Sequence, residues 1–151
     1  MKSLLSLSEG ASLALHGLVL VAKRHPERVS ARELALALDA SEAHLAKVFQ
    51  KLHRAGIVDS LRGPAGGFSL ARPAGGVSLI EIYQIIDGDV HPGACPLGKT
   101  KCLFRECIFT GGINGILAEL HDKLASITLA DVIGHDGPEA VQQKKRKAVR
   151  S

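Results

Sequence analysis

The sequence predicts a mainly α-helical protein with one small β wing, and two observations lead to this fold class. First, residues 41–55 place apolar side chains at the spacing of one helix face, and Gly56 ends that helix. Second, residues 57–58 and 68–70 are short strand-like runs joined by a glycine-rich loop. These runs predict a helix followed directly by a two-stranded hairpin. The apolar helix face consists of Leu45, Val48, Phe49 and Leu52.

The first predicted helix covers roughly residues 8–23 and ends before His25-Pro26. Apolar residues lie on almost every side of it, so we expect it to be buried on more than one side. In a chain of 151 residues, this pattern indicates that a second subunit covers part of the helix.

Another helix is expected just before the one over residues 41–55. Ser30 and Glu33 match a capping box, and the residues that follow Ser30 place alanine and leucine on one face. Residues 39–42 interrupt this helix and cap the next one, which leaves a turn of about three residues. A helix, a tight turn, a second helix and a hairpin together predict a winged helix-turn-helix domain over residues 1–87.

The second of these helices and the hairpin carry basic and small residues that suit contact with double-stranded DNA. The helix would occupy the major groove, and the hairpin would reach phosphates or the minor groove. An ordinary helix and hairpin with a solvated basic face is the alternative. The residues predicted to contact DNA are Ser41, Ala43, His44, Lys47, Lys51, Arg62, Gly63 and Gly66.

Composition is compatible with a small DNA-binding protein. The formal net charge is +4 and the isoelectric point is about 9.1, so attraction to a polyanion is expected. Aromatic residues make up only 3% of the chain, which argues against binding of single strands by base stacking. Neither a secretory signal nor a membrane span is recognisable, so we expect a cytoplasmic protein with reduced thiols and no membrane partner.

Beyond the hairpin, Ser78 begins a helix that Asp87-Gly88 closes, and residues 88–107 form a loop without periodicity. Residues 108–133 predict a dimerisation helix and a short capping turn, because apolar residues recur at coiled-coil spacing. A helix packed on its own core is the alternative. Residues 134–151 are expected to form a disordered basic tail. The predicted dimerisation stripe is Ile113, Leu117, Leu120, Leu124 and Ile127.

The loop over residues 88–107 holds all the cysteines of the chain, which are Cys95, Cys102 and Cys107. Thiolates favour zinc, copper(I) and iron–sulfur clusters. Zinc fingers place paired ligands two to four residues apart, and no such pair occurs here. Spacing alone therefore supports an iron–sulfur cluster and unliganded redox thiols equally, with zinc in third place.

Three stretches of the chain, together with the downstream cysteines, resemble the Rrf-two family of bacterial transcriptional regulators. They are SEAHLAKVFQKLHRAGIV, LRGPAGGF and SLIEIYQIIDG, and the resemblance extends over about residues 7–130. It implies a homodimeric winged-helix regulator whose cysteine loop holds an iron–sulfur cluster, either 2Fe-2S or 4Fe-4S, near the dimer helix.

In this resemblance the three cysteines match the cluster cysteines, although the middle one is displaced by one residue relative to IscR-like members. Thr110 stands where IscR-like members carry a histidine ligand, and Ser12 stands where NsrR-like members carry an acidic ligand. His16, one helical turn further along, resembles the ligand of another branch and is our candidate for the fourth metal ligand. Glu9 and His91 are the next candidates.

Arg62 matches the wing arginine of the family, whereas Ala46 stands where an IscR-like member carries a selective glutamate. The target sequence of that branch therefore does not carry over to this chain. The predicted function is that of a homodimeric, sequence-specific DNA-binding regulator that senses redox state, nitric oxide or iron–sulfur status.

Three alternatives to the cluster-based sensor remain at the level of sequence. The first is a cluster-free, thiol-based regulator. A cysteine redox enzyme is a second, but the chain has neither a C-x-x-C motif nor a βαβ pattern, so we expect no enzyme. A zinc-dependent interaction module is the third.

Overall fold

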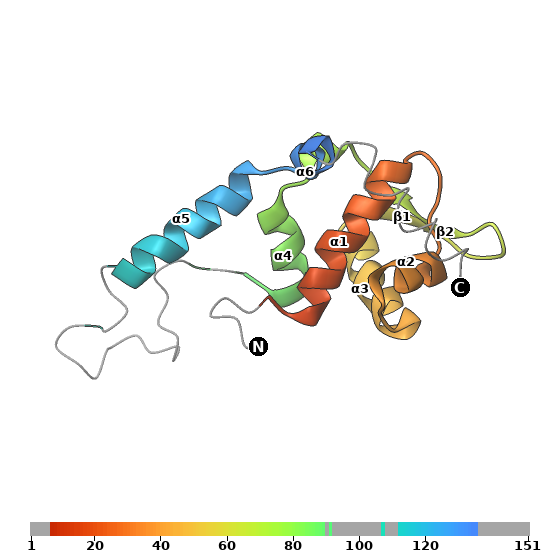
Figure 1. Ribbon diagram of the computed structural model, residues 1–151, viewed down its shortest axis with the longest axis horizontal. Helices are drawn as coiled ribbons and strands as arrows, with labels where there is room; N and C mark the ends of the chain where they lie inside the picture. Colours follow the sequence, from red (N-terminus) through yellow and green to blue (C-terminus); the bar gives the residue numbers. More distant parts are fainter. Residues whose placement is uncertain (1–6, 90, 92–106, 108–111, 136–151) are drawn as a thin grey trace, which may run out of the picture.

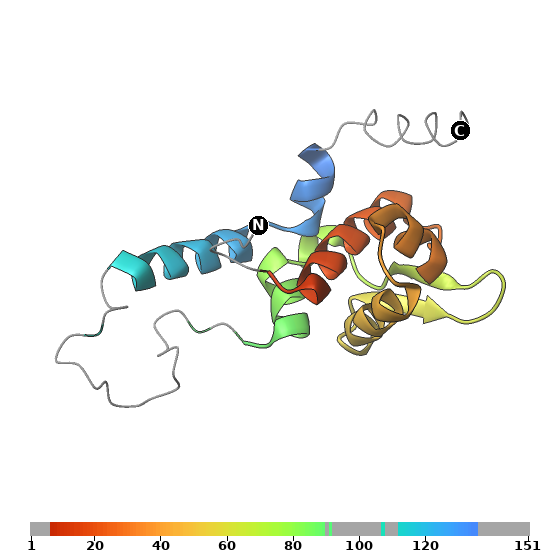
Figure 2. The same ribbon diagram turned by 60° about the horizontal axis from the view of Figure 1, so that its bottom comes forward.

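A computed structural model describes residues 7–89, 91, 107 and 112–135 (Figures 1 and 2). Its helices and strands are α1 Glu9–Arg24, α2 Ala31–Leu38, α3 Glu42–Arg54, β1 Val58–Leu61, β2 Gly67–Leu70, the 3₁₀ turn η1 Ala74–Gly76, α4 Leu79–Asp87, α5 Gly112–Ser126 and α6 Leu129–His135. The predicted fold class, mainly helical with a two-stranded antiparallel wing, is confirmed. The wing and α5 project from opposite ends of the molecule (Figure 1).

Helix α1 lies at the centre of the fold and packs against α2, α3, α4, α6 and β2. Ser8 caps its N-terminus, and the Ser8 hydroxyl oxygen accepts a hydrogen bond from the Ala11 amide at 3.0 Å. Leu18 and Val21 are fully buried, while Leu15 is only partly buried. Other segments of the same chain therefore provide much of the burial that the sequence predicted for this helix.

Helix α1 lies directly against α3 at Gly17. A Cβ atom built on Gly17 would lie 2.7 Å from Cε2 of Phe49, well inside van der Waals contact. The Phe49 ring is fully buried, and its centroid lies 4.7 Å from that of Phe68 on β2. One aromatic side chain thus joins α1, α3 and the wing.

The predicted capping box opens α2. The Ser30 amide donates to Oε2 of Glu33 at 2.9 Å, and the Glu33 amide donates to the Ser30 hydroxyl at 3.2 Å. The backbone and side-chain hydrogen bonds from Ser30, with a smaller contribution from Arg24, lower the pKa of Glu33. Asp39 then takes the left-handed conformation, with φ 51°, and Ser41 caps α3, as the turn chemistry predicts.

Three segments form the base of the wing. Strands β1 and β2 pair from Val58 opposite Leu70 to Leu61 opposite Gly67, and Val29 bridges to Phe68 on the other side of β2. Gly67 has φ 142°, and a Cβ there would lie 2.6 Å from the Val29 carbonyl oxygen, so the site requires glycine. At the base of the hairpin, β2 is therefore hydrogen-bonded on both sides, to β1 and to Val29.

The chain after α5 returns to this core. The Leu79 amide donates to the Ile127 carbonyl oxygen at 3.0 Å, and the Leu129 amide donates to the Val77 carbonyl oxygen at 2.8 Å. Leu129 is fully buried with the residues of the winged domain. The sequence predicts a short capping turn after the dimerisation helix within residues 108–133; in the structure this part of the chain includes α6, which packs against α1 and η1.

We expect Gly17→Ala to lower the free energy of unfolding by about 1–3 kcal/mol, the usual cost of overpacking a core. The added methyl group would overlap the buried Phe49 ring. Gly115→Ala is the matched control, because nothing lies within 4 Å of a Cβ at that α5 position. Urea denaturation followed by circular dichroism measures both, and a Gly17→Ala variant as stable as wild type would contradict the packing described.

Candidate nucleic-acid interface

The buried face of α3 fixes which of its side chains point outward. Because the four predicted apolar residues are all buried, the opposite face consists of residues spaced at i, i+4, i+7 and i+11. These outward residues are Ala43, Lys47, Gln50 and Arg54, and each is exposed. Sequence reasoning found the first two and missed the second two, although continuing the helical spacing past Lys47 would have found them.

Other predicted contacts lie at the start and on the flank of α3 rather than on this face. Ser41 accepts a hydrogen bond from the His44 amide at 3.4 Å and so caps the helix. Nδ1 of His44 lies 3.5 Å from Oε1 of Glu9 on α1. Lys51 is exposed, and its ammonium group donates to the carbonyl oxygen of Ile86 on α4 at 3.1 Å.

The tip of the wing is narrow and presents Arg62 to solvent. Gly63 has φ 109°, and the Gly66 amide donates to the Gly63 carbonyl oxygen at 2.9 Å. A Cβ on Gly66 would lie 2.2 Å from the Leu61 carbonyl oxygen, so a side chain there would break the turn. The hairpin reaches well beyond α2 and α3 (Figure 2), and Arg62 is exposed.

A second arginine, Arg28, forms hydrogen bonds at the base of the wing. The guanidinium Nη1 of Arg28 donates to the carbonyl oxygens of Asp59 on β1, at 3.4 Å, and Gly67 on β2, at 3.3 Å. One side chain therefore links both strands to the segment that precedes α2. This fixes the direction in which the hairpin points relative to α3.

The candidate metal ligands are only partly covered by the structure. Cys95, Cys102 and Thr110 lie outside the described residues, whereas Cys107 is half-buried and His91 is exposed. Within the described part of the chain, no group of three or more histidine, cysteine or acidic residues is placed to hold a metal ion. The predicted metal site stays a prediction.

His16, the candidate fourth ligand, is an exposed residue of α1. Its Nδ1 lies 2.7 Å from the carbonyl oxygen of Ser12. Since a carbonyl only accepts, Nδ1 carries the proton, and Nε2 of the neutral ring keeps a free lone pair. This arrangement is the one in which a histidine ligates a metal through Nε2.

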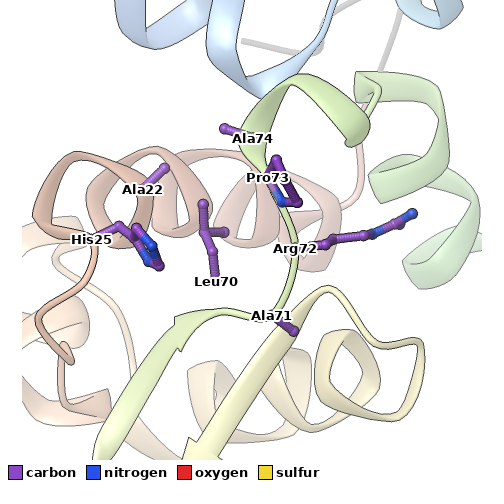
Figure 3. Close-up of a pocket in the computed structure, with 7 residues that line it drawn as sticks. All are labelled: Ala22, His25, Leu70, Ala71, Arg72, Pro73 and Ala74. Atoms are coloured by element: carbon purple, nitrogen blue, oxygen red, sulfur yellow. The ribbon is translucent and has the colours of Figure 1, made fainter.

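A shallow, mainly apolar hollow of about 480 Å³ lies beside the end of α1 (Figure 3). The side chain of Arg72 on its rim donates to Glu81 on α4. The lining has no cluster of catalytic groups, and none of its residues belongs to α3. It is lined by Ala22, His25, Leu70, Ala71, Arg72, Pro73 and Ala74.

Helix α5 carries an exposed apolar strip. Ile113 is 46% exposed, Ile116 is 61% exposed and Leu117 is 36% exposed, while Leu120 and Leu124 are half-buried. Coiled-coil spacing predicted this strip except for Ile116. Helix α5 packs against α4.

Helices α2 and α3 followed by a two-stranded wing form a winged helix-turn-helix, an architecture typical of DNA-binding transcriptional regulators. More specifically, the chain belongs to the Rrf2 family, because the family model described as "Iron-dependent Transcriptional regulator" matches residues 7–135. The family and the solved structures similar to the chain are transcriptional regulators and not enzymes, as the sequence predicted. In the part of the chain that the structure describes, none of the helices has the length and apolar character needed to cross a membrane.

Two curated relatives carry names within this class. The chain is 33% identical over 129 residues to the HTH-type transcriptional regulator IscR of Cereibacter sphaeroides, covering 83% of each chain. It is 28% identical over 116 residues to the regulator NsrR of Bacillus licheniformis, covering 76% of this chain and 81% of that one.

Two solved structures share the fold. The global cysteine regulator CymR of B. subtilis has a TM-score of 0.72 at 24% identity, covering 89% of this chain and all of that one. IscR of T. potens has a TM-score of 0.69 at 24% identity, covering 86% and 87% of the two chains. At this identity the likeness establishes the fold alone.

We expect Ile116→Asp to convert the protein to a monomer, because a charge would be buried wherever this strip is covered by a second copy. Leu36→Asp on α2 is the matched control, since Leu36 is 76% exposed but lies outside the strip. Sedimentation velocity at micromolar concentration distinguishes the two. A wild-type monomer, or a dimer that Ile116→Asp leaves intact, would count against the predicted dimerisation helix.

Proposed function

We propose that the chain acts as a homodimer that binds double-stranded DNA and reads its sequence. The observation that carries this proposal is the outward face of α3, where Lys47, Gln50 and Arg54 are exposed side by side. Lysine and arginine pair with guanine, and glutamine pairs with adenine through its amide donor and acceptor. A helix with these three groups on one face is suited to base edges in the major groove.

The wing supplies a second contact that does not depend on base sequence. Arg62 at the tip binds phosphate or enters the minor groove, while the glycines around it let the backbone come close to the duplex. Ser41, Ala43 and His44 lie at the start of α3, where recognition helices meet the groove. In a dimer, the two copies of α3 read half-sites about one helical turn apart.

The second part of the proposal concerns the signal. Cys95, Cys102 and Cys107, with His16 as the fourth ligand, would hold an iron–sulfur cluster. Soft thiolates with one imidazole suit such a cluster, and the free Nε2 of His16 supports this donor set. When bound, the cluster would supply iron that reacts with oxidants or nitric oxide. Any change in the cysteine segment would favour one arrangement of the two recognition helices over another.

A cluster-free thiol regulator is the second candidate function. Ser12 and Thr110 stand at the two positions where related branches supply a fourth ligand, and neither is a usual ligand for iron. In this version the same three thiols respond by oxidation, and α3 and the wing keep the roles described above.

If the cluster is present, protein purified without oxygen should be brown and should contain iron and sulfide. Cys102→Ala should remove the colour, whereas His16→Ala should leave a cluster that is more easily lost, since three thiolates remain. Visible spectra with iron and sulfide analysis measure this. Colourless, iron-free wild-type protein after anaerobic reconstitution would eliminate the cluster and leave the thiol regulator.

The DNA contacts separate into two kinds by their salt dependence. Arg62→Ala should weaken binding to every duplex, and should lower the slope of log affinity against log salt by about one if Arg62 binds a phosphate. Lys47→Ala should cost roughly 1–3 kcal/mol on the cognate duplex alone if Lys47 reads a base. Titrations on cognate and scrambled duplexes at several salt concentrations test both. Unchanged affinities for both variants would mean that α3 and the wing are not the DNA-binding surface.

A further inference from the structure

The last turn of α4 is tied to two elements that are distant in sequence. The ammonium group of Lys51 on α3 donates to the Ile86 carbonyl oxygen at 3.1 Å. The hydroxyl of Ser8, which caps α1, donates to Oδ1 of Asp87 at 2.6 Å. A Cβ on Gly10 would lie 3.1 Å from Cγ2 of Ile86, so α1 and α4 are also in close contact at this point. We call Ile86 and Asp87 the α4 end.

The bond from Lys51 suits the chemistry of a helix terminus. The last carbonyl groups of a helix lack partners within it, and the helix dipole places partial negative charge there. An ammonium donor therefore gains both a hydrogen bond and a favourable charge interaction at Ile86. Because Lys51 lies on the flank of α3 towards α4, this bond leaves Lys47 and Gln50 pointing outward.

The α4 end is also the start of the cysteine segment. Residues 88–107 follow it directly, and all three cysteines of the chain lie in that stretch. The part of the sequence that carries the cysteines is thus joined directly to the turn of α4 that Lys51 contacts. The hydrogen bond from Lys51 to Ile86 connects this turn to α3, and in the function proposed above the outward face of α3 reads DNA.

We infer that Lys51 is a positioning residue that couples the α4 end to the DNA-reading face of α3, and not a phosphate contact. This inference rests on the proposed function. It assigns Lys51 a different role from the direct contact that its place on a basic helix predicts. The two roles differ in a measurable way, because only a lysine that neutralises a phosphate releases a counterion on binding.

The first test measures the salt dependence of binding to a duplex that the wild-type protein selects from a random pool. Lys51→Met should leave the slope of log affinity against log salt unchanged, and Lys51→Arg, which keeps a donor, should behave as wild type. A slope reduced by about one in Lys51→Met would identify a phosphate contact and overturn the inference. Failure of the wild-type protein to select or bind any duplex would refute the proposed function instead.

The second test measures coupling, which a merely structural role would not change. Iodoacetamide alkylates thiols, and since every cysteine lies in residues 88–107, it alters that segment alone. The ratio of duplex affinities before and after alkylation should be roughly 5- to 150-fold in wild type and in Lys51→Arg, the usual range of coupling between sites. In Lys51→Met the ratio should fall towards one. An equal ratio in wild type and Lys51→Met, or no change on alkylating wild type, would overturn the inference.

Discussion

The contact between α1 and α3 at Gly17 and Phe49 is the constraint on which the proposed DNA-binding surface depends. The absence of a side chain at Gly17 lets the Phe49 ring lie directly against α1, and the same ring packs against Phe68 of the wing. The rotation of α3 about its axis is set by this packing, since Phe49 lies in the middle of its buried face. The outward position of Lys47 and Gln50 follows from it.

The wing depends on the same core for its direction. Phe68 pairs through its backbone with Val29, and Arg28 links both strands of the hairpin to the chain before α2. The proposed DNA-binding surface, formed by α3 and Arg62, is therefore held together by contacts on its buried side. Rigid placement of the groups that meet a ligand lowers the cost of ordering them on binding. In the coupling inferred above, changes in α4 reach this surface through the hydrogen bond from Lys51 to the Ile86 carbonyl oxygen.

The sequence predicted those features that depend on patterns of neighbouring residues. Helical spacing, the capping box at Ser30 and the glycine-rich loop each act over a few residues, and the structure confirms the helix-turn-helix and the wing. Contacts between distant segments were not predictable in this way. The bond from Lys51 to Ile86 and the return of Leu129 to the core join residues 35 or more positions apart, and no periodicity encodes them.

The sequence predicted some residues of the candidate site and missed others. The spacing of α3 identified Lys47 but was not followed as far as Gln50 and Arg54, and coiled-coil spacing on α5 passed over Ile116 because it lies beside the strict stripe. The cysteines were recognised by residue type and spacing. These two features identify candidate metal ligands, but they do not identify the residue that would complete the ligand set. The identity of a fourth ligand depends on how the cysteine segment lies against α1, and this is a tertiary property.

In the proposed function, two copies of α3 read one duplex side by side. Hydroxyl-radical footprinting of the wild-type protein on its selected duplex tests this most directly. We predict protection on one face of the DNA, in two symmetric half-sites about one helical turn apart. A single protected half-site, or uniform protection without this spacing, would contradict the claim.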